Sequence, residues 1–197
     1  MENDRSTIAD MNSENSNDTK ERLLKIGEDL IYRGGIAATG MDLLVKTSGV
    51  ARKSIYRYFG TKEALVIEIL KRRDRNWMRW FESEVNKADS AADKLLRMFD
   101  VLCDWFASEN FRGCAFINTA GETGDPEDPV RRVDKEHKEN VKAFVLSLCK
   151  EYGFDDPEAR ARQFLILIDG AITVAHLLGD SRSAVDAKAI AQQLLNR

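Results

Sequence analysis

The sequence has 197 residues, of which 43% are apolar and only three are proline, so it is long enough to bury a sizeable core. Its wealth of Leu, Ala, Lys and Glu favours helix over strand, and we expect an all-α protein of about nine helices. The three cysteines, Cys103, Cys114 and Cys149, are odd in number and not spaced as metal ligands. We therefore expect no disulfide framework, no metal site and no cofactor.

We expect neither a signal peptide nor a membrane span. The chain does not open on a charged segment followed by an apolar one, and its longest apolar stretch, from Phe164 to Leu178, is short and contains Asp169. Free thiols suit a reducing compartment. These features predict a cytoplasmic protein with no membrane partner.

The net charge of −3 is unevenly distributed along the chain. Residues 1–18 are acidic and polar, which predicts a disordered tail. Residues 19–62 hold nine Lys and Arg against four Asp and Glu, a net charge of +5, and residues 63–197 are acidic again. A basic module of this kind is typical of nucleic-acid binding. We expect a DNA-binding domain over 19–62 and an effector-binding and dimerisation domain over 63–197.

Capping residues predict three helices in the basic module. A Ser, Thr or Asp followed three residues later by an acidic side chain marks a helix start, and a glycine that accepts positive φ marks an end. The expected helices run from Asp18 to Gly34–Gly35, from Thr39–Asp42 to Gly49, and from Arg52 to Phe59. Three short helices with a tight glycine turn before the last predict a helix-turn-helix unit.

Longer helices follow, and each carries an apolar stripe at helical spacing. We expect them from Thr61 to Val85, from Ser90 to Phe106, from Gly113 to Thr123, from Asp128–Pro129 to Gly153, from 157 to 179, and from Ser183–Asp186 to Leu195. Together they make the second domain all-helical.

The segment ARKSIYRYFGTK, from Ala51 to Lys62, holds four basic residues, three aromatics and no acid. On a helix, Ile55 and Phe59 face inward, so the basic side chains project outward. Lys and Arg neutralise phosphates, and both can donate to the O6 and N7 atoms of guanine. A solvated charged helix is the simplest interpretation of an isolated basic run. This run lies where a recognition helix belongs, which favours DNA binding.

The stretch GVARKSIYRYFGTKEAL, from Gly49 to Leu65, resembles the DNA-binding domain of TetR-family repressors. The resemblance extends over residues 19–65. It implies phosphate contacts by Thr39, Gly40, Tyr58 and Lys62, and a surface of Arg52, Lys53, Ser54, Tyr56 and Arg57 in or beside the major groove. Ala51 departs from the capping residue usual in the family, so this helix lacks that side-chain acceptor.

The same resemblance implies how such a protein works. It implies a repressor that binds a double-stranded, pseudo-palindromic operator as a homodimer. It also implies that a small-molecule effector, whose identity the sequence does not give, changes the angle of the fourth helix and releases the DNA.

The segment from Phe164 to Leu178 is apolar on every side and must be covered on both. One face can pack in its own domain, and the other can meet the same helix of a second subunit. The residues that we expect at this interface are Phe164, Ile168, Ala171, Ala175 and Leu178. The alternative is a central helix of a monomer.

A few polar residues interrupt the apolar helices and predict an effector pocket, an apolar cavity with a few polar anchors. Cys114, Asn118 and Glu122 share one helical face, and His137 lies on an apolar stripe. The expected lining residues are Trp77, Phe81, Phe99, Cys103, Phe106, Cys114, Asn118, Glu122, His137 and Thr173. For each of the aromatics, and for His137, an ordinary place in the core is the alternative.

The segment RGCAFINTAGE, from Arg112 to Glu122, resembles the corresponding stretch of a TetR subgroup that includes electrophile-sensing members. In those proteins the equivalent cysteine is the reactive thiol, which makes Cys114 a candidate redox or electrophile sensor. A helix N-terminus and Arg112 can lower its pKa. The alternative is a small, inert core residue.

Two other classes of function compete with a regulator. Cys114, His137 and Glu122 could serve an enzyme as nucleophile, base and orienting group. However, the sequence has no Gly-rich phosphate loop and no nucleophile elbow, so we expect no enzyme. A helical binding module that does not bind DNA leaves the +5 segment unexplained.

Overall fold

The computed structural model describes the backbone of residues 3–196 and the side chains of residues 17–196. These residues form nine helices and no strand, which confirms the all-α prediction. The helices are α1 (Asn3–Ala38), α2 (Met41–Ser48), α3 (Arg52–Phe59), α4 (Lys62–Val85), α5 (Ala91–Phe106), α6 (Ala115–Glu122), α7 (Pro129–Tyr152), α8 (Pro157–Leu178) and α9 (Arg182–Leu195).

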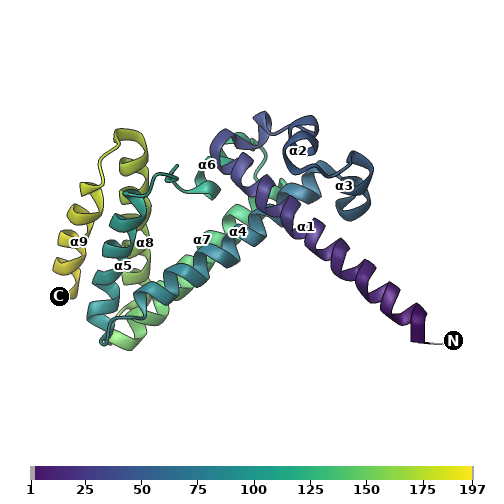
Figure 1. Cartoon of the computed structure of the whole chain (residues 1–197). Helices are drawn as coiled ribbons and strands as arrows, with labels where there is room; N and C mark the ends of the chain where they lie inside the picture. The colour runs from purple at the N-terminus through teal and green to yellow at the C-terminus, as the bar shows by residue number, and fades with distance from the viewer. Residues whose placement is uncertain (1–2, 197) are drawn as a thin grey trace.

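The helices are arranged in two groups that a pair of long helices connects (Figure 1). The C-terminal half of α1 packs with α2 and α3 at one end of the molecule, and α5, α8 and α9 pack together at the other. Between them α4 and α7 lie side by side, and α6 contacts both α7 and α1. Because α4 contacts both α1 and α3, a movement of α4 would shift the unit of α1, α2 and α3.

The first helix begins earlier than predicted and continues to Ala38, beyond the predicted glycine pair. It begins at Asn3, although residues 1–18 were expected to be disordered and a start was expected at Asp18. No proline or glycine occurs among the first 26 residues, so nothing in the sequence stops a helix from extending toward the N-terminus. Near its other end, Gly35 adopts φ 85° and kinks the chain, as the glycine pair predicted.

The capping predictions are confirmed at three helix starts and at the ends of α2 and α7. The side chains of Thr61, Ser90 and Asp128 accept hydrogen bonds from the first turns of α4, α5 and α7, and Gly49 and Gly153 end α2 and α7 with positive φ. Thr39 and Ser183 are not caps, and these predictions were wrong. Both hydroxyls donate to carbonyls of other segments instead, that of Thr39 to Gly35 and that of Ser183 to Ala171.

Helix α8 has an inner and an outer face. Phe164, Ile168, Ala171 and Ala175 are buried inside the subunit and are at most 4% exposed. They were expected at the dimer interface. Instead they lie on the face of α8 that packs against α5, α7 and α9 of the same subunit. The outward residues, which we call the outer α8 stripe, are Ile166, Gly170, Thr173, Val174, Leu177 and Leu178.

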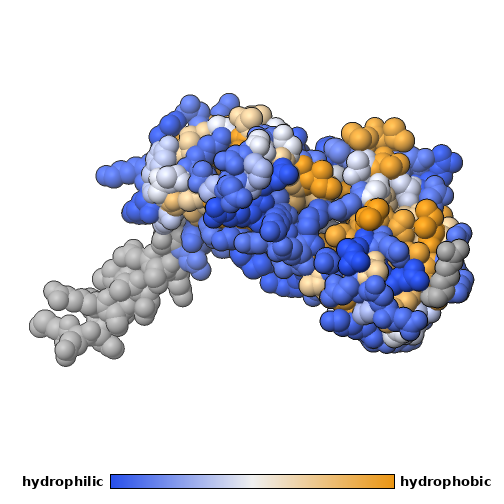
Figure 2. Space-filling view, turned by 180° about the vertical axis from the view of Figure 1, so that it is seen from behind, coloured by the Kyte–Doolittle hydropathy of each residue, from blue (hydrophilic) through white to orange (hydrophobic). Residues whose placement is uncertain are grey.

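The outer α8 stripe is strongly apolar although it is exposed. Ile166, Leu177 and Leu178 are between 70% and 75% exposed, and Val185 and Ile190 extend the apolar surface onto α9. Figure 2 shows apolar residues gathered on this part of the molecule, at the right of the view. Exposed apolar patches of this kind mark interaction surfaces. Leu178 is the one residue of the expected interface that belongs to it.

Among the helices that the structure describes, α8 alone is long and apolar enough to span a membrane by length and composition. This is a weak indication, because a core helix of a soluble protein has the same length and composition. The inner face of α8 packs on three helices of the protein itself.

Candidate DNA-binding surface and buried thiol site

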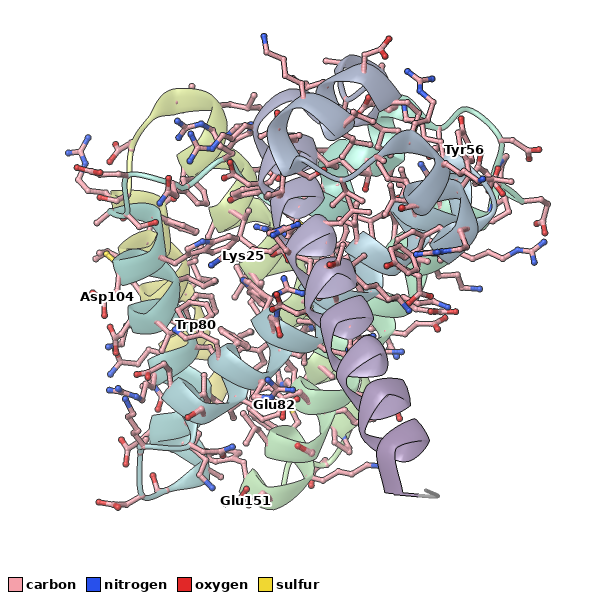
Figure 3. All side chains as sticks on the ribbon, turned by 45° about the vertical axis from the view of Figure 1, so that its right-hand side comes forward. Lys25, Tyr56, Trp80, Glu82, Asp104 and Glu151 are labelled. Carbon is pink, nitrogen blue, oxygen red and sulfur yellow. The ribbon has the colours of Figure 1, made fainter. Side chains whose placement is uncertain are left out.

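The outward face of α3 carries the side chains that the sequence predicted for DNA recognition. Ile55 is buried at 1% exposure and fixes the helix on α4 and its neighbours, whereas Arg52, Lys53, Tyr56 and Arg57 are exposed. Ser54 and Tyr58 are half-buried. Figure 3 shows Tyr56 on the side of the molecule away from α8 and α9. This surface is therefore open to a large partner.

Two of the basic side chains already have local partners. Arg52 forms an ion pair with Asp42 of α2, and the guanidinium of Arg57 lies 5.1 Å from the ring centre of Tyr58. The pair with Asp42 is exposed, so it contributes little stability. It does orient Arg52 at the junction of α2 and α3.

Neither α2 nor α3 has a side-chain cap at its N-terminus. Gly40 precedes α2 and Ala51 precedes α3, and neither supplies an acceptor for the first turn. The prediction from Ala51 is thus confirmed. Uncapped N–H groups at a helix start can bind phosphate oxygens.

Two side chains that were predicted to contact phosphate form hydrogen bonds within the protein instead. Thr39 is 1% exposed and its hydroxyl donates to the carbonyl of Gly35 over 2.7 Å. The Lys62 ammonium donates to the carbonyl of Ile36 over 3.0 Å. Both side chains hold the kinked end of α1, because this end leaves carbonyls without helical partners.

At the other site, Cys114 precedes α6 and is 6% exposed. The ring of His137 on α7 lies beside this thiol, and both side chains line the same small cavity. The Nδ1 atom of His137 lies 2.7 Å from an Oδ1 oxygen of Asp74 on α4, and Asn140 donates to the other oxygen of Asp74 over 2.9 Å. A thiol, an imidazole and a carboxylate from three segments thus form one row, in which the imidazole and the carboxylate are hydrogen-bonded.

The charges around the row favour an ionised thiol. Burial opposes ionisation of Cys114, but the adjacent ring of His137 and the positive charge of Lys138 together lower the pKa of the thiol below its ordinary value. Burial likewise opposes protonation of His137, but Asp74 and Cys114 together raise the pKa of its ring. The surroundings of the row therefore favour ionisation of the thiol and protonation of the ring.

A small cavity of about 10 Å³ lies next to the thiol. It is lined by Arg73, Trp77, Trp105, Cys114, Ala115, Phe116, His137, Lys138, Val141, Ile168, Asp169 and Ile172. A volume of this size holds about one water molecule. Any larger ligand must displace its walls, which include side chains of α4.

Three of the predicted effector residues, Trp77, Cys114 and His137, line this cavity. The other seven lie elsewhere. Phe81, Phe99 and Phe106 are core residues, and Cys103 contacts the carbonyl of Ser181. Asn118 donates to the carbonyl of Arg112, and Thr173 lies on the outer α8 stripe.

Glu122 has a different partner from the one expected. Its carboxylate accepts hydrogen bonds from the backbone N–H groups of Ile36 and Ala37, over 2.9 and 2.8 Å. The third member of the row at Cys114 is therefore Asp74, not Glu122. Because α6 has Cys114 before its first residue and Glu122 at its last, this helix joins the thiol site to the end of α1.

Sequence reasoning missed Asp74 and the ion pair of Lys138 with Asp169, whose atoms are 2.5 Å apart. Asp74 stands between Arg73 and Arg75 on an amphipathic helix, where an acid is typical of a solvated face. No local signal marks it, because its partners His137 and Asn140 are more than 60 residues away.

A basic reading unit of three helices, joined to a helical body with a buried polar site, defines a DNA-binding transcriptional regulator of the helix-turn-helix class. Comparison with known proteins gives the family. Residues 23–69 match the family described as bacterial regulatory proteins, tetR family. The DNA-binding part of the chain is therefore of the TetR family of transcriptional regulators.

Relatives and solved structures agree with this assignment. The chain is 28% identical over 145 residues to the transcriptional repressor NemR of Escherichia coli, covering 73% of this chain and 72% of NemR. It is 23% identical over 180 residues to the E. coli regulator YjdC, covering 89% and 93%. A TetR-family regulator from Streptomyces coelicolor superposes with a TM-score of 0.83 at 27% identity, over 90% of this chain and 94% of the other.

NemR has also been solved, in a structure described as its reduced form. It superposes with a TM-score of 0.82 at 22% identity, over 89% of this chain and 96% of NemR. At this identity the likeness shows a shared fold. The relatives are transcriptional regulators and not enzymes, and regulators of this family are soluble DNA-binding proteins.

Proposed function

We propose that the protein is a cytoplasmic repressor that binds a pseudo-palindromic operator as a homodimer. The observation that carries this proposal is the exposed apolar stripe on α8, which lies at the opposite end of the molecule from the basic face of α3. Pairing of two stripes about a two-fold axis would bury them and leave both α3 helices free. The two half-sites should then be one helical turn, about 34–36 Å, or a multiple of it apart.

Selection from a pool of random DNA duplexes tests this proposal, because the protein itself picks out the operator sequence. The bound duplexes should converge on one motif with two inverted half-sites. Convergence on a single half-site without symmetry, or failure to bind any duplex at low salt, would contradict it.

Release of the operator is expected to follow from movement of α4. The helix starts in the reading unit at Lys62 and supplies Arg73 and Trp77 to the cavity beside Cys114. Because the cavity holds about one water molecule, a small-molecule effector must push these walls apart. Such a ligand releases DNA only if it binds the displaced state more tightly than the DNA-bound state.

A second mode of release, modification of Cys114 by an oxidant or electrophile, is supported by the row of Cys114, His137 and Asp74. A thiolate is the reactive form of cysteine, and an adjacent imidazolium stabilises it. Attachment of a group to the sulfur would fill the same cavity and displace the same walls. The likeness to NemR, solved as a reduced form, agrees with this mode.

Treatment with a thiol-modifying agent tests the second mode. Iodoacetamide or hypochlorite should release the wild-type protein from its selected operator, whereas Cys114→Ser should stay bound. Cys103→Ser is the matched control and should be released like the wild type. Burial raises the pKa of Cys149 to about 11, so this thiol should not react first. Equal release of the wild type and Cys114→Ser would exclude the mode.

A further inference from the structure

The row at Cys114 assigns a role to a residue of α4 that has no place in the DNA-binding surface. We infer that Asp74 is a positioning residue that sets the reactivity of Cys114 through His137. This inference deepens the second mode of release proposed above and rests on it.

The ring of His137 is fixed in place from three sides. Its Nδ1 atom is 2.7 Å from Asp74, and the ring of Phe116 stacks on it with 3.8 Å between ring centres and 16° between planes. The edge of Trp77 closes a third side, with 5.3 Å between ring centres. With Nδ1 occupied by the carboxylate, the other ring nitrogen is the one left for the thiol. Asp74 thus determines which nitrogen faces Cys114.

Several other charged or titratable groups surround the thiol and the ring. They are Tyr32 on α1, Arg73 on α4, Asp134 and Lys138 on α7 and Asp169 on α8. Most of them have partners of their own. Lys138 forms an ion pair with Asp169. Arg73 forms an ion pair with Glu28 over 3.3 Å, and its guanidinium lies 3.6 Å from the ring centre of Tyr32. Asp74 is the anion that His137 contacts directly.

The chemistry follows from this arrangement. The proton of the Cys114 thiol passes to the free ring nitrogen of His137, and the second ring N–H donates to Asp74. In alkylation by iodoacetamide, the sulfur forms a bond to the methylene carbon, the carbon–iodine bond breaks, and iodide leaves. The proton stays on His137 until the ring releases it to water. No oxidant or reductant takes part in this reaction.

Without the Asp74 carboxylate, the buried imidazolium loses its main support and the thiolate loses its counter-charge. Reactivity of Cys114 should then require a higher pH. The electrostatic coupling between Cys114 and His137 also acts from the thiol to the ring. Once the thiolate has been consumed, the imidazolium keeps one anion instead of two, its pKa falls, and the ion pair that holds α4 to α7 becomes a weaker neutral hydrogen bond.

The pH profile of alkylation tests this inference. The rate of carboxamidomethylation of Cys114 is measured across pH 5–10 on the free protein, by mass spectrometry of the peptide that contains it. For Asp74→Asn, the midpoint of the profile should move to higher pH and the rate at pH 7 should fall about tenfold, as a shift of one pKa unit implies. Glu82→Gln is the matched control. It removes the same charge from the same helix about two turns away, and its profile should match the wild type (Figure 3).

An unshifted profile for Asp74→Asn would overturn the inference. A second measurement tests the link with Asp74 in place. The chain has two histidines, so the NMR signals of His137 can be assigned with His176→Gln. Alkylation of Cys114 should lower the pKa of His137, and an unchanged titration would contradict the link.

The two proposals fail separately. If alkylation shows the expected profiles but leaves the operator bound, the row exists and the sensing mode is wrong. If alkylation releases the operator but the Asp74→Asn profile is unshifted, Cys114 senses without help from Asp74.

Discussion

The unit of α2 and α3 and the site around Cys114 differ in how they handle charge. On α3 the basic side chains are exposed, and the one buried residue of the helix, Ile55, is apolar. Around Cys114 the charged groups are buried or half-buried, and each has a partner. The first surface is arranged to receive an external partner, whereas the charged groups of the second pair with one another.

This contrast indicates where sensitivity to mutation should lie. Exposed charges act through long-range attraction, so single changes on α3 should alter affinity and salt dependence without affecting the fold. Buried pairs are coupled to their surroundings, so single changes near Cys114 should alter titration and stability.

The largest effect should come from neither region but from the surface that brings two reading units together. Leu177→Glu places a charge in the outer α8 stripe, where the native side chain is 73% exposed in the single chain. Burying this charge at the dimer interface is costly, so the variant should be monomeric and should bind the operator more than about 100-fold more weakly. Sedimentation and gel shift measure both effects.

The control for this variant is Ala143→Glu, which adds the same charge at an exposed position of α7. It should remain dimeric. A dimeric Leu177→Glu protein would exclude the outer α8 stripe as the interface.

On the reading unit, Arg52→Ala should weaken operator binding by about 1–3 kcal/mol and change the base preferred at one position of each half-site. Its fold should be unaffected, because Arg52 is exposed and its ion pair with Asp42 contributes little. Binding to a panel of single-base operator variants measures the preference. An affinity loss that is equal on all variants would assign Arg52 to phosphate instead of base contacts.

In the buried region, Asp134→Asn should raise stability at neutral pH. Asp134 is 4% exposed, accepts one hydrogen bond from Thr119 over 2.7 Å, and has a second oxygen that is buried without a partner among the described residues. Burial raises its pKa to about 6 from an ordinary value of 3.8, although the bond from Thr119 opposes the shift. The folded state therefore favours the neutral acid.

The stability that this neutral acid confers is fully present below about pH 4 and is lost as the pH rises through 6. Asn stays neutral, so at pH 8 the variant should be about 1–2 kcal/mol more stable than the wild type. Urea unfolding at pH 5 and pH 8, at one protein concentration, measures the difference. A variant that is equally destabilised at both pH values would contradict the raised pKa, because its effect would not depend on ionisation of the carboxyl.

The smallest effect separates two lysines that the family resemblance groups near the DNA. Lys53→Ala should reduce the slope of log affinity against log salt by about 0.9 if it contacts one phosphate. Lys62→Ala should leave the slope unchanged and lower the stability of the reading unit, because Lys62 donates to Ile36. Titrations at four salt concentrations distinguish these outcomes. A reduced slope for Lys62→Ala would show that DNA displaces its internal contact.

The sequence predicted the fold well because its signals are local. The caps at Thr61, Ser90 and Asp128 and the exposed basic face of α3 depend on residues within one or two turns of each other. The face of α8 that is buried depends on packing with α5, α7 and α9, which an all-apolar helix does not encode. For the same reason Cys114 and His137 could be selected as candidates, whereas Asp74 and the true place of Glu122 could not.

The decisive quantity is the number of chains that bind one selected duplex. Native mass spectrometry of the complex should show two copies of the chain on each duplex, and the free protein should also be a dimer. One chain per duplex, with a monomeric free protein, would contradict the proposal that two reading units act together across paired α8 helices.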